Sequence, residues 1–386
     1  MNILFDFITT YRITGASEYV RRVFFSLLNT IEKKHRTDVH IIAAYDSKRG
    51  NQAYPDLAFD ILSQRAISYI DIHGKSLLQI VNDLHIDKIF IGCAQFWGRY
   101  RDLDKLDCEI LCVIHDLSYE EKSQNFIDLW MQMYRSNLHF AWNWGKSMLR
   151  GAPSLGLMKP FRLLMERNNK FRIIAVSEYT KNTLKYQFDF NEFHIVTLYS
   201  PERIYQNQAS HIENTALGDI IARKKKYFLA LHGNRPMKNV EKVIRAFGRY
   251  VEEHNDVFIL TTGMTEKRCK NHIALPFLSE SDLANAYAHC WAFVYPSLFE
   301  GFGYPPIEAM HYGKPVLSSN VCSMPEVLGD APIYFSPFYD SDIYRAMCCL
   351  NENNYESYSK KSMAQYLLVK ERQEADLNKL IKRLVR

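Results

Sequence analysis

Residues 291–319 place an apolar run, a glycine-containing loop, a helix start and a second apolar run in succession. The first apolar run is typical of a short buried strand. Pro305 and Pro306 suit the first turn of a helix, where a missing N–H costs little, and Gly313 suits its end. The stretch therefore predicts a strand that runs into a loop and then a helix, which is where open α/β sheets bind ligands.

Two carboxylates, Glu300 and Glu308, lie eight positions apart around this loop. Gly301 and Gly303 allow the backbone to approach a ligand closely, and the N–H groups at a helix start can face an anion. The loop therefore predicts a ligand site that combines carboxylates with an anion-binding turn. Two solvated carboxylates on an ordinary exposed loop are the alternative.

The stretch resembles the Glu-x7-Glu signature of retaining GT-B glycosyltransferases of the glycosyltransferase 4 family, the group of bacterial mannosyltransferases and glycogen synthases. The resemblance implies that Glu300 contacts the donor sugar and that Glu308 holds the ribose of the sugar nucleotide. It also implies that the amides of Phe302, Gly303 and Tyr304 face the diphosphate. The family retains the anomeric configuration, takes a nucleotide diphosphate-sugar as donor substrate and needs neither a metal ion nor another cofactor.

Strand-like apolar runs alternate with helical patterns along the chain, as in α/β proteins with parallel sheets. The length of 386 residues allows two domains. With the resemblance, we expect the GT-B class, in which two Rossmann-like, doubly wound parallel-sheet domains face each other across a cleft. Residues 1–200 would be the acceptor-side domain and 201–365 the nucleotide-sugar-binding domain, with a polar linker at 200–223. A C-terminal helix at about 366–386 would pack back on the first domain.

The individual elements follow from the same patterns. Strands are expected at 3–8, 39–45, 88–93, 109–115, 172–177, 194–198, 227–232, 257–262, 272–274, 292–295, 316–319 and 333–335. Helices are expected at 17–34, 75–84, 178–187, 239–253, 279–289 and 304–312.

A second motif at residues 231–247 runs from a strand into a glycine-containing loop with two cations, followed by an amphipathic helix. A departing nucleoside diphosphate gathers negative charge, so fixed cations beside it lower the barrier. The resemblance assigns Gly233, Arg235 and Lys238 to donor binding. Met237 occupies the family's usual arginine position, so Arg235 would replace that arginine from the other side of Pro236. Basic residues on a solvated loop are the alternative.

Two motifs in the first half also match the family. His115 follows a strand, and the resemblance places it near the donor sugar, where imidazole can donate or accept a hydrogen bond near neutral pH. A satisfied structural histidine is the alternative. Gly15 and Ala16 lie in the turn after the first strand, and the resemblance places their backbone beside the diphosphate and the acceptor. Ser17 is expected to be the N-cap of the helix that follows.

Two other kinds of site receive less support. The triplets at 102–104 and 340–342 have the Asp-x-Asp form of metal-dependent GT-A transferases. We expect both to be structural, the second as helix caps, and no metal site. A glycosidase would need two carboxylates roughly 5–10 Å apart. Glu300 and Glu308 could supply them, but hydrolysis would not explain Lys238 or two nucleotide-type domains.

Composition limits the location and the partners. No apolar run is long enough to span a bilayer, the N-terminus lacks the pattern of a signal peptide, and the eight cysteines form no CxxC pair. We therefore expect a cytoplasmic protein without disulfides. The net charge of +5 is too small to indicate nucleic acid. Basic residues interleaved with tryptophans at 142–172 suit the inner face of the cytoplasmic membrane, with a solvated basic helix as the alternative.

We therefore expect a retaining, metal-independent glycosyltransferase of the hexosyltransferase type. It would move a sugar from a nucleotide diphosphate-sugar to a hydroxyl of a glycan or lipid-linked glycan, in bacterial surface polysaccharide synthesis. Two alternatives stay open: a sugar-nucleotide epimerase or hydrolase on the same fold, and a non-catalytic nucleotide-sugar-binding subunit.

Overall fold

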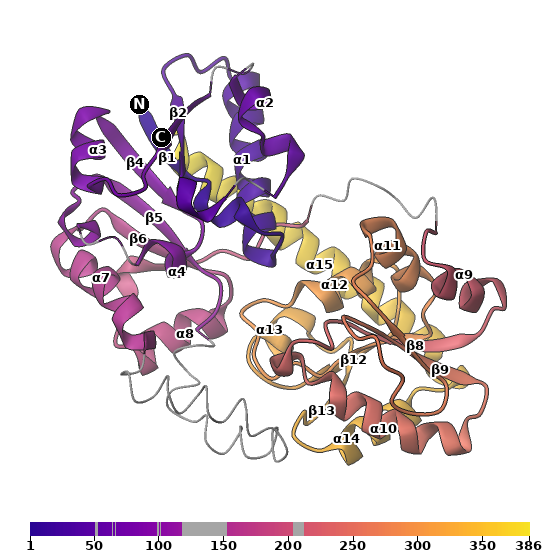
Figure 1. The fold of residues 1–386 in the computed structure, drawn as a ribbon. Helices are drawn as coiled ribbons and strands as arrows, with labels where there is room; N and C mark the ends of the chain where they lie inside the picture. Colours follow the sequence, from indigo (N-terminus) through magenta and orange to yellow (C-terminus); the bar gives the residue numbers. More distant parts are fainter. Residues whose placement is uncertain are drawn as a thin grey trace. The chain divides into compact units, whose positions relative to one another are not determined.

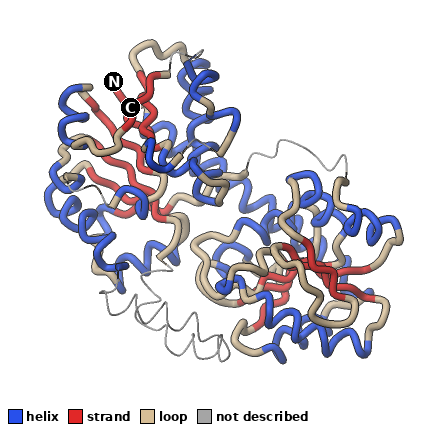
Figure 2. Tube along the Cα trace, in the orientation of Figure 1, coloured by secondary structure: helices blue, strands red, loops and turns tan. Residues whose placement is uncertain are grey.

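The computed structural model describes residues 1–117 except 51, 52, 64, 66, 99 and 101, residues 153–203 and residues 212–386, without the side chains of 153–158. The chain forms two compact units. Unit 1 comprises Met1–Ile204 and Arg372–Arg386, and unit 2 comprises Tyr205–Glu371. Each unit has its own sheet with helices on both faces (Figures 1 and 2).

In unit 1, seven parallel strands have the order β3-β2-β1-β4-β5-β6-β7. They are β1 (Asn2–Asp6), β2 (His40–Tyr45), β3 (Ser68–Asp71), β4 (Ile86–Ile91), β5 (Glu109–Ile114), β6 (Phe171–Ala175) and β7 (Ile195–Thr197). The helices are α1 (Gly15–Lys33), α2 (Phe59–Ser63), α3 (Leu77–Asp83), α4 (Ala94–Trp97), α7 (Pro153–Arg167) and α8 (Glu178–Gln187). Short 3-10 helices are η1 (Ile8–Tyr11), η2 (Ser47–Arg49), η3 (Pro55–Leu57), η4 (Leu103–Lys105) and η5 (Glu192–His194).

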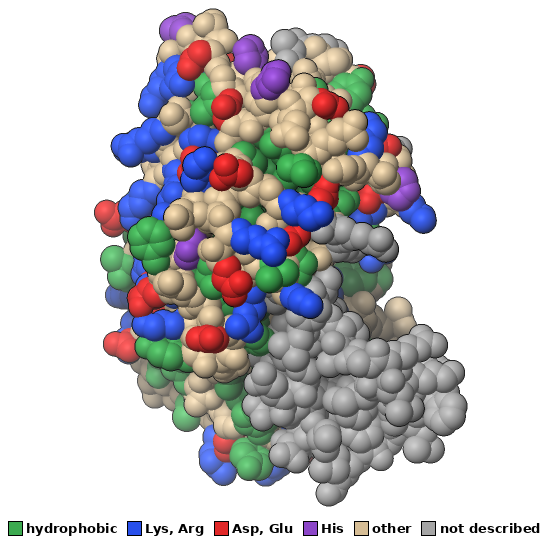
Figure 3. All heavy atoms as spheres, turned by 90° about the vertical axis from the view of Figure 1, so that its left-hand side faces the viewer, with side chains coloured by type: hydrophobic (Ala, Val, Ile, Leu, Met, Phe, Trp, Pro, Cys, Tyr) green, Lys and Arg blue, Asp and Glu red, His purple; other side chains and the backbone are tan. Residues whose placement is uncertain are grey.

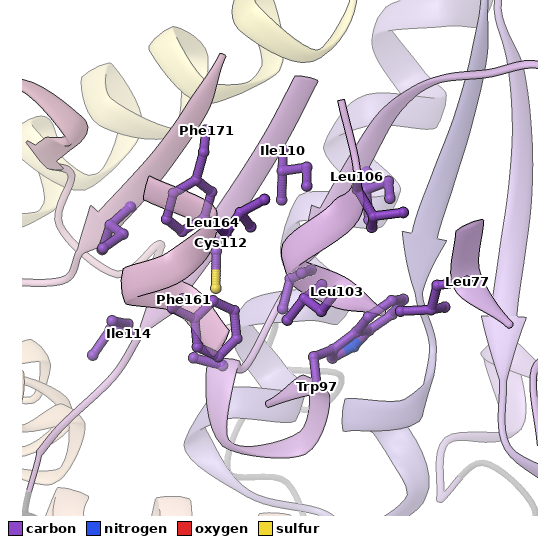
Figure 4. Packing of buried hydrophobic residues seen from close by; sticks show 14 of the residues in the cluster. Leu77, Trp97, Leu103, Leu106, Ile110, Cys112, Ile114, Phe161, Leu164 and Phe171 are labelled. Carbon is purple, nitrogen blue, oxygen red and sulfur yellow. The ribbon is translucent and has the colours of Figure 1, made fainter. Parts of the chain in front are cut away.

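The two faces of the unit 1 sheet are buried by different helices, because successive side chains of a strand point to opposite faces. Cys112 of β5 points toward Phe161 of α7, and Ile110 of β5 and Trp97 of α4 belong to the same cluster (Figure 4). On the opposite face, Phe5 of β1 packs against α1, with its ring centroid 5.4 Å from that of Phe24. Both faces of a parallel sheet are thus covered, as its apolar strands require.

In unit 2, six parallel strands have the order β10-β9-β8-β11-β12-β13. They are β8 (Lys226–Ala230), β9 (Val257–Thr262), β10 (His272–Leu275), β11 (Ala292–Tyr295), β12 (Val316–Ser319) and β13 (Ile333–Phe335). The helices are α9 (Thr215–Ala222), α10 (Val240–Glu253), α11 (Glu280–His289), α12 (Tyr304–His311), α13 (Met324–Leu328) and α14 (Asp340–Cys349), with the 3-10 helix η6 (Pro236–Lys238). Helices α10 and α14 pack together over one face, and α11 and α12 cover the other (Figure 1).

The last helix, α15 (Glu352–Leu384), starts in unit 2 and ends in unit 1. Its C-terminal part is bound to unit 1 by polar contacts. Lys88 Nζ donates to the carbonyl of Arg383 at 2.7 Å, and Arg383 Nε donates to Glu109 at 3.0 Å. Gln373 Nε2 donates to the carbonyl of Ser200 at 2.6 Å. Residues 372–386 therefore stabilise the unit in which the chain begins.

Three local expectations need correction. Ser17 is not the N-cap of α1: Thr14 is, and the two side chains bond each other's backbone N–H in a capping box at 3.2 and 2.7 Å. Residues 215–222 of the expected linker form α9, because burial of Leu217 and Ile220 outweighs the polar composition of the segment. The sequence reading also missed β3, an edge strand with two exposed and two half-buried residues, which pairing with β2 holds in place.

The two Asp-x-Asp triplets have structural contacts. Asp102 accepts hydrogen bonds from Ser76 Oγ and from the Leu78 N–H, and Asp104 pairs with Arg167 at 2.8 Å. The residues of 340–342 lie in the first turn of α14, whose N-cap position is Tyr339, so the expectation that they are caps was wrong. In the described ranges no group of three or more His, Cys, Asp or Glu side chains could hold a metal ion. The helices that can be described include none that is both long and apolar enough to cross a bilayer.

A buried histidine in unit 2 predicts a dependence of stability on pH. Nε2 of His272 lies 2.8 Å from Thr261 Oγ1, and Nδ1 accepts from the Arg268 N–H at 3.0 Å. Burial, with Arg268 and Lys267 nearby, lowers the pKa of His272 to about 4 from the ordinary value of 6.5. The unfolded chain therefore binds the proton more readily, so the contribution of neutral His272 is complete above pH 6.5 and is lost as the pH falls toward 4.

We expect the His272→Gln variant to lack this acid-dependent loss. The difference in unfolding free energy between wild type and variant should then shrink between pH 6.5 and 4, measured by urea unfolding at several pH values. A difference that stays constant across this range would contradict the assignment.

Candidate functional site

The carboxyl ends of β8 and β11 define the candidate site of unit 2. These strands are neighbours, but the chain leaves β8 toward β9 on one side and leaves β11 toward β12 on the other. Such a reversal opens a crevice outside the carboxyl ends of the strands, where open α/β sheets bind ligands. The loop after β8 carries Lys238, and the loop after β11 carries Glu300.

Hydrogen bonds join these two loops. Asn239, in the left-handed region at φ 57°, donates from Nδ2 to the carbonyls of Pro296 at 3.3 Å and Pro337 at 2.8 Å. The Leu298 N–H donates to the carbonyl of Met237 at 2.9 Å. The position of Lys238 is therefore set by contacts of the residues on either side of it, and Glu300 follows two residues after the bonded Leu298.

Lys238 and Glu300 form a largely buried ion pair, with side chains 17% and 12% exposed. Oε1 of Glu300 accepts hydrogen bonds from Lys238 Nζ, from the Tyr295 hydroxyl at 2.6 Å and from Ser297 Oγ at 2.5 Å. Among the described residues, no hydrogen bond ends on Oε2. The carboxylate is thus held by one oxygen, and the other is available to a hydroxyl of a bound molecule.

Tyr295, the last residue of β11, also accepts a hydrogen bond from Lys238 Nζ at 2.8 Å. Burial, together with the negative charge of Glu300, raises the pKa of Tyr295 well above its ordinary value. The phenol therefore stays protonated. Its O–H donates a hydrogen bond to Glu300, and its oxygen accepts a hydrogen bond from Lys238.

Gly303 lies at the start of α12, and Glu308 lies in the middle of this helix. Glu308 is 5% exposed, and its Oε2 accepts from the Tyr287 hydroxyl of α11 at 2.9 Å. Gly303 is the N-cap of the helix at φ 91°, and a Cβ there would lie 2.3 Å from Met324 Cε. Only glycine fits this position without strain. Phe302 is buried beside Tyr304. The backbone of this turn leads into the N-terminus of α12, where the helix dipole favours an anion.

The loop after β8 contains Gly233 and Arg235, the other two residues expected to bind the donor substrate. The Gly233 N–H donates to the carbonyl of Thr262 at 2.7 Å, and a Cβ on Gly233 would lie 2.3 Å from Met264 Cγ. Arg235 precedes η6 with an exposed side chain, whose guanidinium makes no hydrogen bond or ion pair with any residue the structure describes. The guanidinium is therefore available to a ligand.

His115 lies at the carboxyl end of β5 in unit 1. Its Nε2 is 2.7 Å from the carbonyl of Gly92, and since a carbonyl can only accept, Nε2 carries the proton. Burial lowers the pKa of His115, which favours the neutral ring. Nδ1 is then a hydrogen-bond acceptor, which suits a sugar hydroxyl.

Gly15 and Ala16 begin α1, after β1 and η1. Gly15 is exposed and Ala16 is half-buried, so their backbone is accessible. The predicted site residues therefore form two groups: His115, Gly15 and Ala16 in unit 1, and the remaining residues, on β8, β11 and α12 or their loops, in unit 2.

The sequence reading missed four polar side chains that hold the unit 2 site: Tyr287, Tyr295, Ser297 and Asn239. Tyr295 lies in an apolar run that was interpreted as a buried strand, and Tyr287 lies in the helix expected at 279–289 and was given no part. Asn239 follows η6 in a left-handed conformation, which asparagine tolerates better than most residues. Its position directly after Lys238 was the one signal that could have marked it.

Comparison with known proteins identifies the domain that carries this site. Residues 219–342 match the family model described as "Glycosyl transferases group 1". Over 357 residues the chain is 33% identical to the "Serotype-specific mannosyltransferase WbdA" of Escherichia coli, an alignment that covers 81% of this chain and 40% of that protein. Two other WbdA proteins are matched over 22% of their length, so the chain spans less than half of these relatives.

Solved structures share the fold along the whole chain. Sucrose-phosphate synthase from Thermosynechococcus elongatus has a TM-score of 0.66 at 12% identity, covering 100% of this chain and 99% of that one. HepE from Anabaena, in complex with UDP-glucose, has a TM-score of 0.61 at 15% identity, with the same coverage. Together with the two parallel sheets, these likenesses identify the GT-B fold class. Residues 219–342 are therefore similar to a glycosyl transferases group 1 domain.

Proposed function

We propose that this protein is a glycosyltransferase that moves a hexose-type sugar from a nucleotide diphosphate-sugar to a hydroxyl of a glycan or lipid-linked glycan. The observation that carries the proposal is the ion pair of Lys238 and Glu300 at the reversal point of a group 1 domain. The relative WbdA is described as a mannosyltransferase. RfbU of Salmonella typhimurium, to which the chain is 32% identical over 131 residues, is described as an O-antigen chain mannosyltransferase. These names support a role in bacterial surface polysaccharide synthesis with mannose as the transferred sugar.

The proposed reaction breaks the bond between the anomeric carbon and the diphosphate and forms a bond from an acceptor oxygen to that carbon. The acceptor proton passes to the departing diphosphate. Lys238 opposes the charge on the diphosphate, and Arg235 adds a second cation that can grip it bidentately. Oε2 of Glu300 accepts a hydrogen bond from a hydroxyl of the sugar, and this contact orients the sugar.

The other site residues take parts that suit their geometry. The turn at Phe302, Gly303 and Tyr304 and the loop at Gly233 give the backbone close access to the diphosphate. Glu308, whose Oε2 accepts a hydrogen bond from Tyr287, holds the ribose. In unit 1, Nδ1 of neutral His115 accepts a sugar hydroxyl, and the backbone at Gly15 and Ala16 borders the donor and the acceptor.

We further propose that the reaction retains the anomeric configuration and needs no metal ion or other cofactor. Both features rest on the resemblance to glycosyltransferase 4 enzymes. The two cations after β8 support the second feature, because they supply charge that a divalent ion supplies elsewhere. Nuclear magnetic resonance of the product and an assay with a chelator test the two features.

The alternatives differ in the fate of the donor. An epimerase or hydrolase changes the nucleotide sugar without an acceptor, and a binding subunit leaves it intact with every acceptor. Nuclear magnetic resonance of UDP-, GDP-, ADP- and dTDP-sugars after incubation with the protein alone, and then with acceptor, separates the three, because it also detects an epimer, whose mass equals that of the original donor. The true donor should also raise the thermal midpoint by mass action.

The first prediction for this site concerns Glu300. We expect Glu300→Ala to lower turnover by roughly 10²–10⁴-fold, because the sugar loses a positioning and electrostatic contact. Glu356→Ala is the control, since this exposed carboxylate lies on α15. Turnover near that of the wild type in Glu300→Ala would contradict the role of Glu300.

The second prediction compares the two cations. We expect Lys238→Ala to weaken binding of the nucleoside diphosphate by about 10- to 150-fold, the value of one hydrogen bond to a charged group. Arg235→Ala should show a similar loss if Arg235 takes over the part of the missing arginine. Isothermal calorimetry measures both, with Lys360→Ala on α15 as the control. Unchanged binding by Lys238→Ala would refute its contact with the diphosphate.

We also propose peripheral contact with the cytoplasmic membrane through the segment at 142–172, of which residues 142–152 lie outside the described residues. Two exposed aromatics of unit 1, Tyr186 and Phe193, lie beside Lys185 and Arg172 and support this proposal. However, several cations on this unit are paired with carboxylates, and Figure 3 shows Lys and Arg interspersed with Asp and Glu.

Vesicles rich in phosphatidylglycerol test the membrane proposal. The wild type should sediment with them, and neutralising Lys159, Arg162 and Arg167 together should abolish sedimentation. Vesicles of phosphatidylcholine alone are the control, because they lack the anionic surface. Absence of wild-type binding to the anionic vesicles would end the proposal.

A further inference from the structure

The ammonium group of Lys238 has two roles. It pairs with Glu300, and in the proposed function it also opposes the diphosphate. An ammonium has three N–H donors, and two of them go to Glu300 Oε1 and to the Tyr295 hydroxyl. With two donors fixed, the direction of the third is fixed as well. The acceptors of the first two therefore decide where the remaining N–H points.

We propose that Tyr295 is a positioning residue that aims both charged groups of the site. Its oxygen accepts from Lys238, and its O–H donates to Glu300, so one side chain sets the direction of the cation and of the carboxylate. This inference rests on the proposed function, since it assigns Lys238 to the diphosphate and Glu300 to the sugar. The sequence predicted a buried strand at Tyr295 and gave this residue no part in the site.

The surroundings of Tyr295 suit this task. The residue ends β11, is 2% exposed, and its ring lies 5.8 Å from that of Phe293 on the same strand. Lysine has a flexible four-carbon stem and loses much rotamer freedom when its charge is held in one place. A phenol fixed by packing restricts that stem, whereas a water molecule in its place would not.

Ser297 supports the carboxylate but cannot replace Tyr295. Its Oγ bonds Glu300 Oε1 at 2.5 Å and also lies within 3.4 Å of the carbonyls of Met237 and Phe299. Its side-chain hydrogen bonds go to Glu300, Met237 and Phe299, and none of them goes to Lys238. Within the described ranges, Tyr295 is the residue that bonds both members of the ion pair.

A second buried tyrosine of unit 2 provides a matched control. Tyr227 lies in β8, the neighbour of β11, is fully buried, and donates its hydroxyl to the carbonyl of Ala286 at 2.8 Å. Tyr227→Phe and Tyr295→Phe each delete one buried hydroxyl that makes hydrogen bonds. A role that is only structural should therefore produce similar effects in the two variants.

The test measures kcat and the donor KM of both variants with the donor that the screen identifies. We expect Tyr295→Phe to lower kcat by about 10- to 100-fold and to change KM by less than about threefold, because the contacts that it aims act mainly in the transition state. Tyr227→Phe should keep kcat within about twofold. In a Lys238→Ala background, Tyr295→Phe should cost less than in the wild type, because the two side chains act together.

Two results would overturn the inference. One is a kcat for Tyr295→Phe that equals that of Tyr227→Phe, and the other is full additivity of Tyr295→Phe with Lys238→Ala. If the wild type transfers sugar and Tyr295→Phe transfers it equally well, the inference is refuted but the proposed function is not. A wild type that binds and transfers no nucleotide sugar refutes the proposed function, and the inference falls with it.

Discussion

The parallel pairing of β8 with β11 is the constraint on which the site depends. The register aligns Ala292 with Phe228 and Phe293 with Leu229, so both strands end at the same edge of the sheet. Strands β8 and β11 are adjacent in the sheet. In sequence, more than 60 residues separate them, and these residues include α10, β9, β10 and α11. Two loops distant in sequence thus meet, and the bonds of Asn239 and Leu298 hold them in contact.

The ion pair between these loops is better explained by function than by stability. Removing two charges from water costs several kcal/mol per ion, and mutual attraction offsets this only with good geometry and further hydrogen bonds. Lys238 and Glu300 have such bonds, from Tyr295 and Ser297, on a single carboxylate oxygen. An arrangement built for stability alone would satisfy both oxygens. Here the other oxygen is left accessible to a partner from outside.

The sequence predicted the second half of the fold closely and the first half less well. Strands β9, β11, β12 and β13 have the bounds expected from the sequence, because each contains apolar residues that are buried in a parallel sheet. Strand β3 has no such run and exists because β2 pairs with it. The carboxylates and Lys238 were found because polar residues next to strands and glycines stand out. Tyr295 was not, because a buried tyrosine and a tyrosine that bonds two charges look alike in sequence.

Unit 1 repeats the same logic at its own reversal point, between β1 and β4. Asp6, fully buried at the end of β1, accepts from the Gly92 N–H at 2.9 Å, and the Gly92 carbonyl faces His115. A Cβ on Gly92 would lie 2.1 Å from Val20 Cγ2, so this residue must be glycine for the strand end to fit against α1. Burial raises the pKa of Asp6, a cost that its bonds to Thr9 and Gly92 offset in part. A carboxyl group in so apolar a place fixes the strand end that orients the imidazole. In both units, then, a buried polar side chain at a strand end positions a site residue. Asp6 does so for His115 through Gly92, and Tyr295 does so for Lys238 and Glu300.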